Sequence, residues 1–307
     1  MITVMLQMVV LIGCGIVWRW INPGGYADRQ VRTILSAGVY YLFLPALVLR
    51  VIWQAPLGIS TLQIAIVAAV GVLVSLAVAW PLMRLLRVSS AVTGACLLAA
   101  AWPNATYLGL PVLVAVFGEL GRSTAIQYDL FACTPLLLTL GVLIARYYGR
   151  RDAQQSEAGL LPALIRVPPL WTAVFAVALH AADIPMPDFI EGALVMLGNA
   201  VVPLMLVNLG LSLQWRSLHW RQLPVLVPVI AVQLGLMPAV VWASATVIGI
   251  HGPLLHAVVL EAALPAMVLG LVICDRHELD TGVYAAAVTL STALSLITLP
   301  LWDGMFV

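Results

Sequence analysis

The chain has 307 residues, of which 63% are hydrophobic and only 9% are charged, and its mean hydropathy is +1.08. Soluble proteins carry about 25% charged residues because much of their surface faces water, so this composition excludes a soluble protein. The formal net charge of +1, with no basic stripe or arm, excludes nucleic acid as a partner. We expect an all-α polytopic membrane protein whose outer surface contacts lipid.

Apolar runs of the length needed to cross a bilayer, about 20 residues, recur along the whole chain. Charged residues or clusters of Pro and Gly separate these runs, and together they predict about ten transmembrane helices. The first run is not expected to be a secretory signal, because no Lys or Arg precedes it and no small-residue cleavage site follows it. The expected ranges are 3–20, 31–54, 60–83, 90–117, 123–147, 168–182, 189–213, 224–249, 255–274 and 281–302.

The arginines lie mainly in alternate loops of this predicted topology. All fourteen basic residues are arginine, and only Arg50 and Arg122 fall on the arginine-poor side. These two either attract an anionic substrate or extend toward the membrane surface. Because loops rich in arginine stay in the cytoplasm, we expect a multi-pass protein of the cell inner (plasma) membrane. Both termini are then periplasmic or extracellular.

A polar loop divides the predicted helices into two sets of five. An odd number of helices in each half means that, if both halves share a fold, the second is inverted in the membrane. Pro45 in the second range matches Pro203 in the seventh, and AAAWPNATYLGLP in the fourth resembles EAALPAMVLGL in the ninth. Inverted repeats with matching interrupted helices are typical of secondary transporters. The expected divisions are 1–148 (first repeat), 149–167 (cytoplasmic linker) and 168–307 (inverted repeat).

The matching prolines predict breaks in the fourth and ninth helices. Pro103 lacks a backbone N–H and disrupts the preceding turn, and unpaired backbone groups persist in a membrane only inside protein or beside a wet cavity. The half-helix after each break begins with free N–H groups that suit an anion. We expect the breaks to cross near the membrane midplane; the alternative is two ordinary kinks. The candidate binding residues are Pro103, Asn104, Thr106, Tyr107 and Gly109 at the first break, and Pro265, Ala266 and Gly270 at the second.

Two acidic residues, Asp129 and Glu261, fall inside predicted helices with no basic residue at the same depth. Ionisable groups at this depth are costly and usually functional. Two functional roles are open for both residues: exchange of protons, or binding of a cation such as Na⁺ with nearby Asn, Thr and carbonyl oxygens. The structural alternative is a protonated acid that hydrogen-bonds a neighbouring helix.

The sequence lacks the motifs of an enzyme. It contains no GxSxG, HExxH, Walker or GxGxxG pattern and no loop long enough for an ATP-binding domain. We therefore expect no catalytic residues, no cofactor and no primary pump. The cysteines have no metal-binding spacing, so we expect them to be buried thiols between helices.

Four segments carry a resemblance to a known family: WPNATYLGLPV, LGNAVVPLMLVNLGLSL, LEAALPAMVLGL and VTLSTALSLITLPLW. Together they resemble the auxin efflux carrier family in its compact bacterial form, over essentially the whole chain. The resemblance implies ten helices in two inverted five-helix repeats, with a scaffold domain, a transport domain and crossed helices 4 and 9. This architecture is similar to that of the bile-acid/sodium symporters. The bacterial members of the family are permeases for small organic acids such as malonate and malate.

The resemblance also implies roles for particular residues. Pro103 and Asn104 would lie at one crossing, and Pro265 and Ala266 at the other. Plant carriers often have Asn where this chain has Ala266, which weakens the expectation of a direct carboxylate contact from that side. Glu261 resembles the acid that helps to hold sodium in the bile-acid relatives, so coupling to H⁺ or to Na⁺ through Glu261 and Asn104 is open.

We expect a secondary transporter (permease) of a small organic anion, a mono- or dicarboxylate such as malonate or malate, that works by alternating access at the crossed breaks. The alternatives are a membrane sensor or complex subunit without transport activity, and a channel-like pore. A homodimer is also left open.

Overall fold

The computed structural model describes residues 2–26, 28–54, 58–149, 167–213 and 219–306, and the statements on structure below concern these residues. Within this part of the chain the secondary structure is helical, with one isolated β-bridge and no strand. Six helices are long and apolar enough to cross a membrane, and shorter apolar helices accompany them. The predicted all-α class is confirmed. The predicted linker, 149–167, lies outside the described residues except at its two ends.

The helices of the first half occupy the first five predicted ranges, and π-helical turns (labelled η) interrupt three of them. In order they are α1 (Ile2–Ile21); α2 (Asp28–Gly38), η1 (Val39–Phe43) and α3 (Leu44–Gln54); α4 (Ile59–Leu85); α5 (Ser90–Ala101), η2 (Ala105–Gly109) and α6 (Leu110–Phe117); and α7 (Glu119–Tyr128), η3 (Asp129–Cys133), α8 (Thr134–Leu136), η4 (Leu137–Gly141) and α9 (Val142–Tyr148).

The helices of the second half occupy the other five predicted ranges. They are α11 (Pro168–Ala181); α12 (Asp188–Asn199) and α13 (Val201–Ser212); the short 3₁₀ turn η6 (Trp220–Gln222), α14 (Leu223–Ala231), the π-helical turn η7 (Val232–Leu236) and α15 (Met237–Val247); α16 (Gly252–Ala262) and α17 (Gly270–Arg276); and α18 (Thr281–Gly304). In the seventh range a single turn at Ala200 separates α12 from α13, and Pro203 lies in the first turn of α13.

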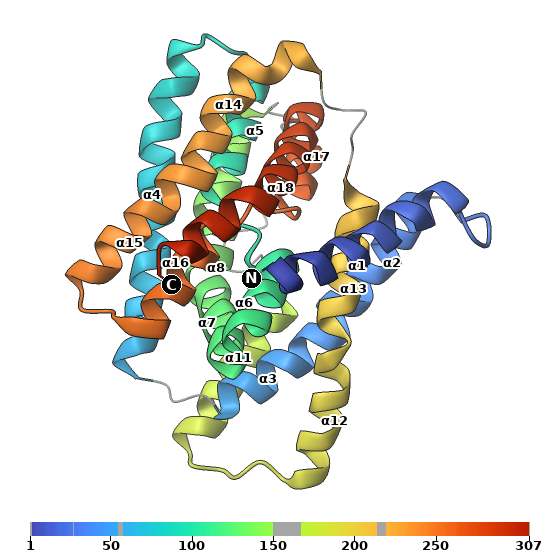
Figure 1. Cartoon of the computed structure of the whole chain (residues 1–307), viewed down its shortest axis with the longest axis vertical. Helices are drawn as coiled ribbons and strands as arrows, with labels where there is room; N and C mark the ends of the chain where they lie inside the picture. Colours follow the sequence, from blue (N-terminus) through green and yellow to red (C-terminus); the bar gives the residue numbers. More distant parts are fainter. Residues whose placement is uncertain (1, 27, 55–57, 150–166, 214–218, 307) are drawn as a thin grey trace.

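The helices form two groups by their contacts (Figure 1). In the first group, α13 packs against α1 and α2, while α3 packs against α11 and α12. In the second group, α4 packs against α5 and α15, and α18 packs against α5, α14 and α17. The broken helices lie where the groups meet, since η2 contacts α13 of the first group and also α16, which packs against α4, α15 and α18 of the second.

Glycine allows α1 and α13 to approach closely. A Cβ atom on Gly210 would fall against the carbonyl of Ile12 and 3.1 Å from the Cα of Gly15, and a Cβ on Gly15 would meet the carbonyl of Val207. Helices in lipid associate through such small residues, because close backbone packing replaces the hydrophobic driving force available in water.

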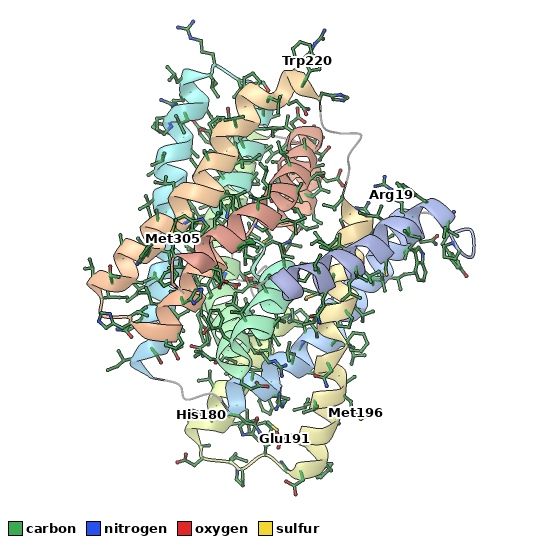
Figure 2. All side chains as sticks on the ribbon, viewed as in Figure 1. Arg19, His180, Glu191, Met196, Trp220 and Met305 are labelled. Atoms are coloured by element: carbon green, nitrogen blue, oxygen red, sulfur yellow. The ribbon has the colours of Figure 1, made fainter. Side chains whose placement is uncertain are left out.

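The outer surface carries many large apolar side chains (Figure 2). Trp20, Met196 and Trp220 are each at least 76% exposed. A surface of this kind would be a liability in water, whereas lipid solvates it. Three of the four cysteines are buried as expected, but Cys14 on α1 is exposed, so the expectation of a buried thiol is wrong at that position.

Candidate functional site

The two helix breaks lie side by side and are joined by backbone hydrogen bonds. α5 ends at Ala101, and Pro103 forms an isolated antiparallel bridge with Ala266. The N–H of Asn104 donates to the carbonyl of Pro265 at 2.8 Å, and the N–H of Met267 donates to the carbonyl of Trp102 at 2.9 Å. Each break therefore satisfies backbone groups that the other leaves free, which is how irregular backbone is tolerated at membrane depth.

Neighbouring helices support this crossing through side chains that the sequence did not single out. Ser291 Oγ accepts from the N–H of Ala266 at 3.1 Å, and the hydroxyl of Tyr284 donates to the carbonyl of Met267 at 2.6 Å. Trp102 Nε1 donates to the carbonyl of Cys133, and Gln233 Nε2 donates to that of Leu264. The only sequence signal for these supports is a polar or amphipathic residue inside an apolar helix.

Asp129 lies opposite the first break. The hydroxyl of Thr106, just after the break, donates to one carboxylate oxygen of Asp129, and the hydroxyl of Thr134 donates to the other at 2.9 Å. Asp129 is the first residue of η3, and Thr134 follows that π-helical turn, so the local geometry brings both to one face. Two threonine hydroxyls are therefore the partners of the Asp129 carboxylate, for which the sequence contains no basic residue at the same depth.

A small cavity of about 60 Å³ opens in front of the crossing. Asn104, Thr106, Tyr107 and Asp129 contribute its polar wall near the break. The remaining lining residues are Val39, Tyr40, Leu44, Leu130, Thr134, Leu137, Leu138, Val167, Pro169, Met205, Met267 and Leu269. Most of this wall is apolar with a few convergent polar groups, the usual composition of a small-molecule site.

Glu261 lies behind the first break, against Gly109, and is fully buried. A Cβ atom on Gly109 would come within 2.5 Å of Glu261 Oε1 and 2.7 Å of Oε2, so only glycine leaves room for this carboxylate. Neither carboxylate oxygen has a hydrogen-bond partner among the described residues, and the same is true of both amide atoms of Asn104. Buried polar groups are nearly always satisfied, so such exceptions indicate a water, an ion or a ligand.

The remaining predicted site residue, Gly270, is not in the cavity wall. It is the first residue of α17, and a Cβ atom there would collide with the hydroxyl of Tyr284. Gly270 thus permits the tyrosine to reach the backbone of the second break. Among the described residues, no group of three His, Cys, Asp or Glu side chains lies together in a way that could hold a metal ion.

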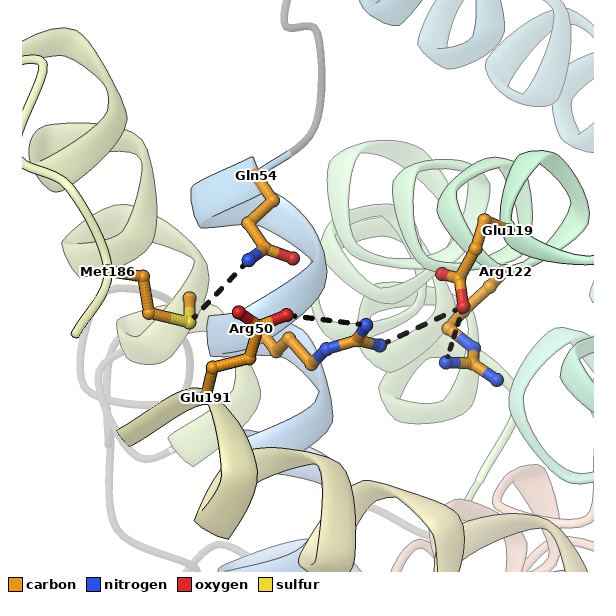
Figure 3. Close-up of polar contacts among 6 residues, drawn as sticks. All are labelled: Arg50, Gln54, Glu119, Arg122, Met186 and Glu191. Carbon is orange, nitrogen blue, oxygen red and sulfur yellow. Dashed lines mark hydrogen bonds and ion pairs between the residues drawn. The ribbon is translucent and has the colours of Figure 1, made fainter. Parts of the chain in front are cut away.

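A separate charged cluster lies at the end of the molecule where α3 and α12 meet (Figure 3). Arg50 lies between two glutamates, with Glu119 of α7 and Glu191 of α12 each 3.8 Å from its guanidinium. Arg122 lies 3.0 Å from the carboxylate of Glu119. The two arginines on the arginine-poor side of the predicted topology are therefore both engaged by glutamates, and Arg50 connects α3 to α7 and α12.

Comparison with known proteins identifies the family of this chain. A family described as "Membrane transport protein" matches residues 1–303. This chain belongs to that family. An uncharacterized transporter of Methanothermobacter thermautotrophicus is 28% identical over 301 residues, covering 97% of this chain and 96% of the relative.

Two further relatives share the same level of identity over shorter stretches. An uncharacterized transporter of Methanocaldococcus jannaschii is 28% identical over 212 residues, covering 68% of this chain and 67% of the relative. Auxin efflux carrier component 2 of Arabidopsis thaliana is 28% identical over 139 residues, covering 43% of this chain and 21% of the carrier. The resemblance to the auxin efflux carriers is thus confirmed, and the chain is an integral membrane protein of a transporter family.

Proposed function

We propose that this member of the membrane transport protein family is a secondary transporter of a small organic anion, a mono- or dicarboxylate such as malonate or malate. The observation that carries the proposal is the hydrogen-bonded pair of helix breaks at Pro103 and Ala266, with a cavity in front of it. Helices that break in pairs are costly to build in a membrane, and transporters use them to expose backbone groups to a substrate.

The chemistry at the first break suits a carboxylate. The N–H of Ala105, at the start of η2, donates to the carbonyl of Pro103. The next two N–H groups of η2, those of Thr106 and Tyr107, have no acceptor inside their own helix, by helix geometry, and they carry a partial positive charge. The amide of Asn104 lies at the same place with both of its polar atoms unpartnered among the described residues. A carboxylate that reached this point would accept hydrogen bonds from both sources.

The proposed transport mechanism is alternating access between two groups of helices. We propose ten membrane spans in two inverted repeats, 1–148 and 168–307, joined by the linker 149–167. Reciprocal packing of the broken helices supports this symmetry, because α5 of the fourth span packs on α18 of the tenth, and α16 of the ninth packs on α7 of the fifth. The arginine-rich loops favour an inner-membrane protein with both termini outside.

Glu261 and Asn104 are the proposed site of the coupling ion. Both are fully buried, and their side-chain oxygens lack partners among the described residues. A proton on Glu261 or a sodium ion held between the two side chains would relieve the cost of the buried acid, which is large for an unpaired charge. Substrate and ion would then bind on opposite sides of the same break.

Uptake into liposomes that contain the purified chain tests this proposal. We expect malonate or malate uptake that saturates with concentration and is competed by unlabelled substrate, with none in liposomes that lack the protein. Flux that rises linearly without saturation would instead indicate a channel. Tight binding with no flux in either direction would indicate a sensor or a complex subunit.

A further inference from the structure

The cavity in front of the helix crossing has an unusual charge for an anion site. Of the residues in its wall, Asp129 is the one that carries a formal charge, and the described wall contains no Arg, Lys or His. Both oxygens of Asp129 already accept hydrogen bonds from threonine hydroxyls, Thr106 and Thr134. An anion entering this space therefore meets a carboxylate and finds no cation.

The groups around Asp129 do not change this balance. Tyr40 of η1, Cys133 of η3 and Glu261 of α16 all lie close enough to interact electrostatically with Asp129, and none of them is a cation. Tyr107 of η2 shares the cavity wall, and Tyr128 precedes Asp129 on α7. The helices α4 and α11 also pack against η3, which begins at Asp129. Their basic residues, Arg84 of α4 and His180 of α11, lie in the last turn of each helix and are not in the cavity wall.

The other charges on α7 are neutralised elsewhere. Glu119 and Arg122 pair with each other at the opposite end of that helix, outside the cavity wall. The electrostatic environment of a bound anion is therefore set by Asp129 together with the dipoles of the helix break. The donors at the break, the amide of Asn104 and the N–H groups of Thr106 and Tyr107 in the first turn of η2, supply partial positive charge and no full charge.

We infer that the substrate carboxylate binds in this cavity together with one proton, which it shares with Asp129. Two carboxylates in one poorly solvated site cannot both stay ionised, and a single proton held between them converts repulsion into a strong hydrogen bond. The proton comes from water in the open cavity and leaves with the substrate, so atoms and charge balance over a transport cycle. This inference rests on the proposed function, and it assigns the substrate class as a carboxylate carried with a proton.

The shared proton also gives Asp129 a role distinct from that of Glu261. Asp129 faces the cavity with its oxygens oriented by two hydroxyls, whereas Glu261 lies behind the break against Gly109. Replacement of Asp129 by Asn keeps the shape of the side chain and removes its ability to hold the extra proton. The variant should therefore separate proton movement from malonate movement.

Proton counting in proteoliposomes tests the inference. The full chain is reconstituted with a pH-sensitive dye in the lumen, the membrane potential is clamped with K⁺ and valinomycin, and labelled malonate is added outside near neutral pH. The wild type should acidify the lumen by one proton for each malonate that enters. Protein-free liposomes correct for passive leak. For whatever malonate Asp129→Asn still carries, the lumen should not acidify, whereas Asp129→Glu should keep the ratio of one proton for each malonate.

A matched control is Asp188→Asn, the same substitution at an exposed position at the start of α12, which should keep the wild-type ratio of protons to malonate. Malonate uptake by the wild type without acidification overturns the inference and leaves the proposed function standing. Lack of uptake of any carboxylate, or uptake of an organic cation in its place, overturns the proposed function and the inference with it. The wild-type count decides whether a proton travels with malonate even if Asp129→Asn fails to fold, and acidification that persists in Asp129→Asn overturns the assignment of that proton to Asp129.

Discussion

At the end of the molecule near Arg50, Glu119 and Glu191 lie within ion-pair distance of an arginine, and their side chains are 68% and 37% exposed. At the helix crossing, Glu261 is fully buried and neither of its carboxylate oxygens has a partner among the described residues. The protein thus pairs its acids where water already screens them and leaves an acid unpaired where the charge is most costly. A fold selected for stability alone would do the reverse, so the crossing is the region to probe for function.

The largest effect is expected from Gly109→Ala. The added methyl group would lie within 2.7 Å of the Glu261 carboxylate and of Leu264 Cδ1, so both side chains would have to shift, and both are fully buried in a packed interior. We expect a loss of about 1–3 kcal/mol in the free energy of unfolding and loss of uptake. The matched control is Gly235→Ala, also in a π-helical turn, where an added Cβ meets nothing within 4 Å. Equal behaviour of the two variants would contradict the close fit at Gly109.

Asn104→Ala should lower uptake without lowering thermal stability. Both amide atoms of Asn104 are buried without partners, so their removal costs the folded protein no hydrogen bond, and thermal stability should hold or rise. A hydrogen bond to a charged substrate contributes about 1.5–3 kcal/mol, so uptake should fall between about tenfold and a hundredfold. Uptake and melting temperature are measured on the same preparation.

The matched control for that variant is Asn208→Ala on α13. Its amide donates to Ser36 Oγ at 2.7 Å, so its removal should lower stability by about 1 kcal/mol and affect uptake less than Asn104→Ala does. Normal uptake by Asn104→Ala would exclude Asn104 from the substrate site.

Glu261→Gln should remove the response of uptake to the coupling gradient. The amide has nearly the same shape as the carboxylate but neither ionises nor binds a cation strongly. We expect wild-type uptake to respond several-fold to an imposed sodium gradient and the variant to be insensitive to it, whereas both should keep the response to a proton gradient that Asp129 provides. An unchanged response to both gradients would leave Glu261 with a purely structural role.

The smallest effect is expected at the exposed ion pairs. Glu119→Gln removes the partner of Arg122 and one partner of Arg50. Because exposed pairs are screened by water and salt, the free energy of unfolding should fall by about 1 kcal/mol or less. The difference should shrink further at high salt, as measured by thermal melts at two ionic strengths. A large, salt-independent loss would mean that this cluster is as critical as the crossing.

The sequence predicted the helical class, the place of the helices and the two breaks, because each depends on local composition or on proline. It also identified Asp129 and Glu261, since acids stand out within apolar runs. It could not predict that Thr106 and Thr134 would hold Asp129, or that Tyr284 and Ser291 would support the second break. These contacts join segments far apart in the chain, and Ser, Thr and Tyr are common enough in membrane helices to carry no signal of their own.

One expectation from the local sequence, the burial of Cys14, is wrong, and one feature of the helices, their π-helical turns, was not predicted. Cys14 resembles the other cysteines in its apolar surroundings, yet its face of α1 is exposed. The π-helical turns at η1, η2, η3, η4 and η7 had no sequence prediction. Such turns depend on how neighbouring helices take up unpaired carbonyls, which a single helical pattern does not encode.

The central claim is that the substrate binds at the crossing of the two helix breaks, and a structure determined with malonate bound tests it most directly. The account predicts density for malonate in the cavity, with one carboxylate beside Asn104 and the two free N–H groups in the first turn of η2 and within hydrogen-bond distance of Asp129. Malonate bound elsewhere on the protein, with this cavity empty at saturating concentration, would contradict the claim.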